Sequence, residues 1–154
     1  MWRGSTQPNA PLVDDGGRSE PPPQTPEASH PTPMRLGSDI AERWLSFAIE
    51  VMRVVAQLPR TSDPAARHIA TQLIRSATSG GASYEEARAA ERRDDFVHQV
   101  GIAAKEMRES LYWLGLIQGA GWAVVGLGPA IREAAELAAI LGASARTART
   151  RPRS

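Results

Sequence analysis

Residues 38–58 read SDIAERWLSFAIEVMRVVAQL, and this stretch decides the fold class. Apolar side chains recur along it at alternating steps of four and three residues, the period of an α-helix with one buried face. This face comprises Ile40, Trp44, Ala48, Val51, Val55 and Leu58. A second set widens it beyond the seam between two helices: Leu45, Phe47, Met52 and Val54. We therefore expect burial on two sides, inside a bundle and against a second subunit. Ser38 suits the N-cap, and Pro59 ends the pattern.

A second helix is predicted from Asp63 and Pro64, because an N-cap residue followed by proline starts a helix well. Its apolar face extends to Ala87 and passes through Gly80 and Gly81. A glycine inside a helix costs about 1 kcal/mol relative to alanine. Two interpretations stay open: one long helix whose glycines admit another backbone closely, and a break into two shorter helices.

A third helix is predicted from Asp94 to the glycines at 119–121, and a fourth from Pro129 to Gly142. No segment alternates apolar and polar residues as a strand would. Four amphipathic helices joined by short loops predict an all-α fold, an antiparallel up-down-up-down four-helix bundle over residues 38–142.

The two ends of the chain differ from this bundle in composition. Residues 1–37 contain eight of the twelve prolines and few large apolar side chains, so we expect a disordered Pro-rich segment. Residues 143–154 contain four arginines and no acidic residue, and we expect a flexible Arg-rich tail. The body between them is slightly acidic, with eleven basic and thirteen acidic residues.

The whole composition excludes several classes of protein. The chain has 154 residues, enough for one domain, and no cysteine, which excludes disulfides, thiol catalysis and Cys-based metal sites. It has no apolar run of about 18 residues and no apolar signal region near its start, so we expect a cytoplasmic protein without a membrane partner.

Several short motifs occur at matching separation on the second and third predicted helices. On the second helix they are Gln72-Leu73 and residues 76–87, SATSGGASYEEA. On the third they are residues 95–98, DFVH, then Lys105-Glu106 and residues 109–114, ESLYWL. With residues 39–41, DIA, on the first helix, the set resembles the bacterial four-helix-bundle proteins often called 23S rRNA intervening-sequence proteins. The resemblance covers residues 39–122 closely and the fourth helix loosely.

This resemblance implies a bundle that assembles as a ring-like homopentamer without established enzymatic activity. A related bundle, the accessory variability determinant of diversity-generating retroelements, works with a reverse transcriptase and nucleic acid. The chain departs from the family at Ser83, where an asparagine is usual, and at Gln99, where a lysine is common. The second departure removes a positive charge and weakens an RNA-binding interpretation.

Arginine clusters are the candidate nucleic-acid contacts, because guanidinium groups match phosphate oxygens. One cluster lies at the junction of the second and third predicted helices and comprises Arg88, Arg92 and Arg93. The other lies in the tail and comprises Arg146, Arg149, Arg151 and Arg153. Acidic neighbours of the first cluster favour an ion-paired loop as the alternative. No groove-reading helix or RNA-recognition motif is present, so any binding should tolerate sequence and weaken with salt.

Four polar residues fall beside or within the apolar faces, where charges need partners. We expect a structural polar network that sets helix register or subunit contacts, with a ligand pocket as the alternative. Its members are Gln72, Arg75, Glu86 and Glu109.

A carboxylate metal site is the weakest candidate. Asp95 and His98 have the spacing of one ligand pair, and Glu86, Glu106 and Glu109 could add oxygens, but the only other nearby histidine, His68, is at the far end of its helix. We therefore predict no metal, no cofactor and no catalytic residue. The leading hypothesis is a non-enzymatic homo-oligomeric scaffold that binds RNA, DNA or a nucleic-acid enzyme. A protein-binding adaptor and, last, a metal-dependent bundle enzyme are the alternatives.

Overall fold

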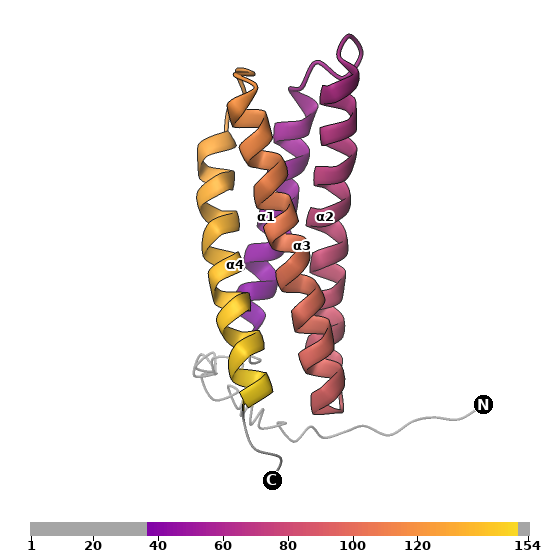
Figure 1. The fold of residues 1–154 in the computed structure, drawn as a ribbon, viewed down its shortest axis with the longest axis vertical. Helices are drawn as coiled ribbons and strands as arrows, with labels where there is room; N and C mark the ends of the chain where they lie inside the picture. The colour runs from indigo at the N-terminus through magenta and orange to yellow at the C-terminus, as the bar shows by residue number, and fades with distance from the viewer. Residues whose placement is uncertain (1–36, 151–154) are drawn as a thin grey trace, which may run out of the picture. The chain divides into compact units, whose positions relative to one another are not determined.

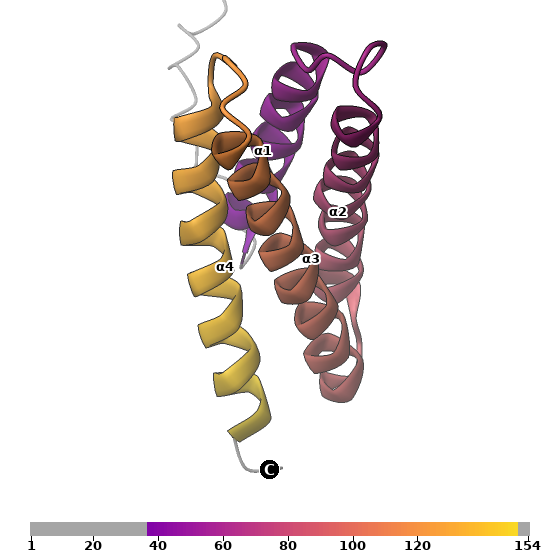
Figure 2. The same ribbon diagram turned by 45° about the horizontal axis from the view of Figure 1, so that its top comes forward.

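The computed structural model describes residues 37–150, which form four α-helices and no strand (Figure 1). The helices are α1 (Ser38–Ala56), α2 (Pro64–Ala89), α3 (Arg93–Gly119) and α4 (Leu127–Thr150). α1 and α3 each pack against α2 and α4, so the described chain is an antiparallel up-down-up-down bundle, as predicted. Figure 2 shows α3 and α4 side by side. The segments expected to be disordered at 1–36 and 151–154 lie outside the described residues.

The bundle has one main apolar core to which all four helices contribute. Its largest fully buried side chains include Trp44 and Phe47 of α1, Leu73 of α2, Met107, Leu114 and Ile117 of α3, and Leu137 and Leu141 of α4. Ser76 and Ser110 are also fully buried, and their hydroxyl groups lie 2.8 Å apart in a hydrogen bond between α2 and α3. None of the helices in residues 37–150 has an apolar stretch long enough to span a bilayer.

The start of α1 differs from the prediction. The N-cap is Gly37 rather than Ser38, and Gly37 has a left-handed backbone with φ 84°. The Tyr84 hydroxyl donates to the Gly37 carbonyl at 3.4 Å, and a Cβ at residue 37 would lie 2.6 Å from that hydroxyl oxygen. Glycine is therefore required by both the backbone angle and the close approach. The helix also ends at Ala56, three residues before Pro59.

The Asp63 prediction is confirmed, because its carboxylate accepts hydrogen bonds from the amides of Ala65 and Ala66 at 2.8 and 3.3 Å. α2 then continues through Gly80 and Gly81 without a break. The Trp44 indole lies against both glycines, and its Nε1 donates to the Ala77 carbonyl at 2.8 Å. The open question is thus decided for one long helix with a close contact at the glycines.

The largest correction concerns the C-terminal end. The fourth helix does not stop at Gly142 but continues to Thr150, so residues 143–150 are not a flexible tail. Ala145 is buried in a small second cluster with Ala87 and Val100, which gives this part of α4 an apolar contact. Arg93 also donates to the Ala148 carbonyl at 2.5 Å, which satisfies one of the acceptors left open at a helix end.

Replacing Gly80 by alanine tests the close contact under Trp44. A Cβ at residue 80 would lie 2.5 Å from Cζ2 of the buried Trp44 ring and 2.8 Å from Cβ of Glu106, which is fixed to the backbone of α3. We expect Gly80→Ala to lower the free energy of unfolding by about 1–3 kcal/mol despite alanine's better helix propensity. Urea unfolding followed by circular dichroism measures the change.

Gly115→Ala is the matched control, because nothing lies within 4 Å of a Cβ at that position of α3. This variant should gain up to about 1 kcal/mol from helix propensity alone. Changes of the same sign in both variants would contradict the packing account.

Candidate functional site

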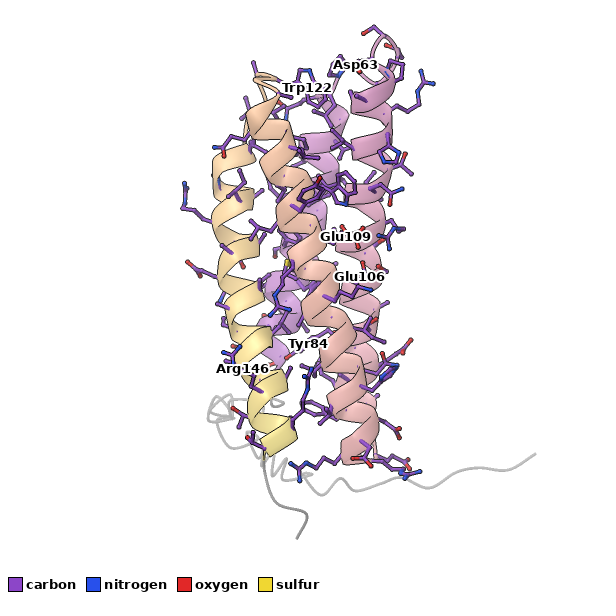
Figure 3. All side chains as sticks on the ribbon, in the orientation of Figure 1. Asp63, Tyr84, Glu106, Glu109, Trp122 and Arg146 are labelled. Atoms are coloured by element: carbon purple, nitrogen blue, oxygen red, sulfur yellow. The ribbon has the colours of Figure 1, made fainter. Side chains whose placement is uncertain are left out.

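The polar network is built on α2 and α3, along the outer edge of their contact. Arg75 of α2 donates to Gln72 at 3.1 Å and forms ion pairs with Glu109 and, at 3.4 Å, with Glu106 of α3. The indole of Trp113 donates to Glu109 at 3.3 Å. Figure 3 shows Glu106 and Glu109 one below the other on α3, beside α2. Of the four residues named from the sequence, three therefore meet: Gln72, Arg75 and Glu109.

Glu86 is not part of this group. Its carboxylate accepts a hydrogen bond from the side-chain amide of Gln99 at 2.6 Å, lower on the same pair of helices. Gln99, a departure from the resembling family, thus pairs with a carboxylate by hydrogen bonding rather than by charge. The two interactions are separate ties between α2 and α3.

The Arg75–Glu109 pair has a direct electrostatic signature. The hydrogen bond from Arg75 is the main cause that lowers the pKa of Glu109 below its usual range, and Glu109 in turn raises the pKa of Arg75. Trp113 adds to the lowering as a second hydrogen-bond donor. The carboxylate is therefore held ionised as a structural partner.

The carboxylates considered for a metal site are engaged elsewhere. Glu106 and Glu109 pair with Arg75, and Glu86 pairs with Gln99. Within residues 37–150, no group of three or more His, Asp and Glu side chains is arranged to hold a metal ion.

The three arginines predicted at the α2–α3 turn have different surroundings. Arg88 points back to its own helix and forms an ion pair with Glu85 at 2.8 Å, and Arg92 is the exposed N-cap residue of α3. Arg93 instead crosses to α4, where it donates to Ala148. Arg151 and Arg153 lie outside the described residues.

The continued α4 contains both Arg146, which Figure 3 labels, and Arg149. A Cβ at Gly101 of α3 would lie 3.7 Å from Nη2 of Arg149, so this guanidinium crosses the seam between the two helices. A Cβ at Gly142 of α4 would lie 3.0 Å from Nη2 of Arg108 and 3.5 Å from Nη1 of Arg146. Guanidinium groups from both helices therefore meet over the seam.

We call the side of the α3–α4 seam that carries Arg146 and Arg149 the basic face. Lys105 and Arg108 also belong to it, and the sequence analysis did not name them as candidate contacts. Both are exposed on α3, and Lys105 lines a groove with Gly101 and Arg149. In the sequence, a glycine precedes a basic residue by one helical turn at two places, Gly101 before Lys105 and Gly142 before Arg146. That signal gains meaning only when α4 is known to continue past Gly142.

The opposite edge of α4 has the reverse charge. A groove of about 710 Å³ between α1 and α4 is lined by four carboxylates and one guanidinium: Asp39, Glu42, Glu50, Glu133 and Arg43. Arg43 pairs with Glu133 at 2.7 Å and with Glu136 at 2.8 Å, which raises its pKa. The two edges of α4 thus differ in sign.

The exposed large apolar side chains include a stripe on α1. Leu45, Ile49 and Met52 are 65%, 42% and 52% exposed, and their spacing of four and three residues aligns them on one face. Leu45 and Met52 belong to the wide face expected from the sequence, Ile49 does not, and the described bundle leaves all three exposed.

Comparison with known proteins supports the fold and leaves the function open. The chain matches no protein-family model, and no curated protein has a similar sequence. Its bundle is similar to the crystal structure of a protein of unknown function from the S23 ribosomal protein family of Bacteroides thetaiotaomicron. The two chains are 25% identical with a TM-score of 0.62, and the match covers 71% of this chain and 96% of the other.

Acid should weaken the bundle through Glu109. Because Arg75 lowers the folded-state pKa of Glu109, the pairing stabilises the fold above the usual glutamate range and is lost as the pH falls through the lowered pKa. We expect Glu109→Gln to be less stable than the parent chain at pH 7 and closer to it at pH 3, by urea unfolding.

Arg75→Gln should also be less stable than the parent chain at pH 7 and closer to it at pH 3, because it removes the main cause of the lowered pKa of Glu109. The double variant should lose little more stability than either single variant. Independent, additive effects of the two substitutions would contradict a coupled pair.

Proposed function

We propose that this chain is a homo-oligomeric helical scaffold that binds RNA or DNA without sequence preference. The observation that carries self-association is the exposed stripe of Leu45, Ile49 and Met52 on α1. Contiguous apolar surface of this kind is typical of protein interfaces. A second copy of the chain is the partner we infer.

The neighbouring part of α2 suits a buried contact. Ile74 and Thr71 line an outer groove with Ala56 of α1, and Arg60 and Arg67 line it too. The hydroxyl groups of Thr71 and Thr78 donate to carbonyls of their own helix, at 2.9 and 2.8 Å. These threonines can therefore be covered by another subunit without leaving an unpaired donor, which supports the α1–α2 face as the interface.

A distant relationship to the 23S rRNA intervening-sequence proteins belongs to this proposal. Its support is the set of motifs on α2 and α3 together with the structural likeness to an S23 family protein. The resemblance implies five subunits in a ring. Within each subunit, we infer that two interactions fix the register of α2 against α3. They are the network of Arg75 with Gln72 and Glu109, and the hydrogen bond from Gln99 to Glu86.

Nucleic-acid binding is supported by the basic end of the bundle. The turn between α2 and α3 and the end of α4 lie at the same end (Figure 1). The turn contributes Arg92 and Arg93 beside the acidic Glu91, Asp94 and Asp95, and the end of α4 contributes Arg146 and Arg149. The chain has no acidic residue after Glu136. Repeated around a ring, this basic end would bind a flexible strand at several points, which raises avidity without new contacts.

Self-association is tested by placing a charge in the stripe. Met52→Glu would bury a carboxylate in the inferred interface, so we expect the mass from light scattering on a sizing column to fall from an oligomer to a monomer. Ser46→Glu, on the polar side of the same helix, is the matched control and should keep the oligomer. A monomeric parent chain at micromolar concentration would refute the scaffold.

A deletion of residues 151–154 tests how much the end of the chain contributes to RNA binding. Deleting residues 151–154 removes Arg151 and Arg153 and leaves α4 as described. We expect weaker binding of a labelled single-stranded RNA by fluorescence anisotropy, and a salt dependence flatter by about 1.4 in log–log slope if both arginines contact phosphates. A ring that binds no nucleic acid would instead favour the protein-binding adaptor.

A further inference from the structure

The meeting point of Arg108 and Arg146 is unusual in its charge. Both guanidinium groups lie over Gly142, within 3.0 and 3.5 Å of the point where a Cβ would be. Neither has a hydrogen-bond or ion-pair partner among residues 37–150. Like charges near one point repel each other, and an anion bound between them lowers that cost.

Two further cations continue the line along the seam. α3 and α4 are antiparallel, so Gly101 with Arg149 lies at one level and Arg108 with Gly142 at another, with Lys105 between them. Arg149, Lys105 and Gly101 line a groove of about 410 Å³. Asp94 and His98 border the same groove, and Asp94 is its one carboxylate. The cations are thus spaced along the helices at intervals of roughly one turn, about 5.4 Å.

The glycines make the arrangement possible. A Cβ at residue 142 would lie tightly against Nη2 of Arg108 and in ordinary contact with Nη1 of Arg146, and one at residue 101 would contact Arg149. Each glycine lies inside a helix, where it costs about 1 kcal/mol relative to alanine. Gly142 is buried and puts no side chain of its own between the two guanidinium groups.

We propose a phosphate-binding cleft along the α3–α4 seam, in which Arg108 and Arg146 clamp one phosphate over Gly142, beside the groove that Lys105 and Arg149 line. Lys105 and Arg149 bind the next phosphates along a nucleic-acid strand. Planar guanidinium groups form paired hydrogen bonds to phosphate oxygens, and the line of cations follows a backbone rather than bases. This inference rests on the proposed nucleic-acid function, and it names the site and two residues, Lys105 and Arg108, outside the clusters marked by the sequence.

Anisotropy with a labelled 20-nucleotide single strand tests the clamp. Arg108→Gln with Arg146→Gln should weaken binding by at least about tenfold at 50 mM salt and flatten the log–log salt dependence. The matched control is Arg60→Gln with Arg132→Gln, which removes two exposed arginines near the other end of the bundle and should cost less than about threefold. Each clamp variant alone should lose nearly as much as the pair, because one arginine cannot hold the phosphate in the same way.

The outcomes separate this site from the wider function. Equal losses in both double variants would overturn the clamp and leave general nucleic-acid binding intact. If the parent chain binds no oligonucleotide, but pyrophosphate raises its melting temperature and not that of the clamp variant, the phosphate cleft stands and nucleic acid as its ligand is wrong. If the clamp variant instead dissociates the oligomer in light scattering, the groove binds the acidic α1–α4 edge of another copy, and the proposal fails.

Discussion

The contact between the Trp44 indole and the two glycines of α2 sets the distance between the first two helices. The ring lies where side chains at residues 80 and 81 would otherwise be, and its Nε1 donates to the Ala77 carbonyl. Its other neighbour is Tyr84, whose ring stacks on it with centroids 6.1 Å apart. Tyr84 in turn contacts Gly37 at the start of α1. One buried aromatic side chain therefore relates the position of α2 to the N-terminus of α1.

The same glycine also brings α3 close. A Cβ at Gly80 would meet Cβ of Glu106, so α2 and α3 approach as nearly as their backbones allow. At this distance Ser76 and Ser110 can share a buried hydrogen bond, and Arg75 can reach both Glu106 and Glu109. The close packing costs helix propensity at the glycines and gains a short, fully satisfied polar contact.

The outer edges of the bundle differ in chemistry. The outer face of α1 exposes the apolar side chains of Leu45 and Met52, and the α2–α3 edge is a network of ion pairs around Arg75. The α3–α4 edge is basic and the α4–α1 edge is acidic. Such segregation offers each edge to a different class of partner, as the proposed self-association and polyanion binding require.

Local pattern was sufficient for the helices, because amphipathic period, an N-cap at Asp63 and the glycines at 119–121 are properties of neighbouring residues. Local pattern did not predict the helix boundaries or continuity at three places where a residue far away in the chain makes the contact. Trp44 packs against the two glycines of the unbroken α2, and Tyr84 donates to Gly37 at the N-cap of α1. Arg93 and the buried Ala145 hold the part of α4 beyond Gly142 against the rest of the bundle. The basic face depends on that last extension, since Arg146 and Arg149 meet Arg108 and Lys105 only when α4 lies beside α3. Helix type follows from short-range periodicity, whereas helix length and the meeting of side chains from different helices follow from packing between segments far apart in the chain.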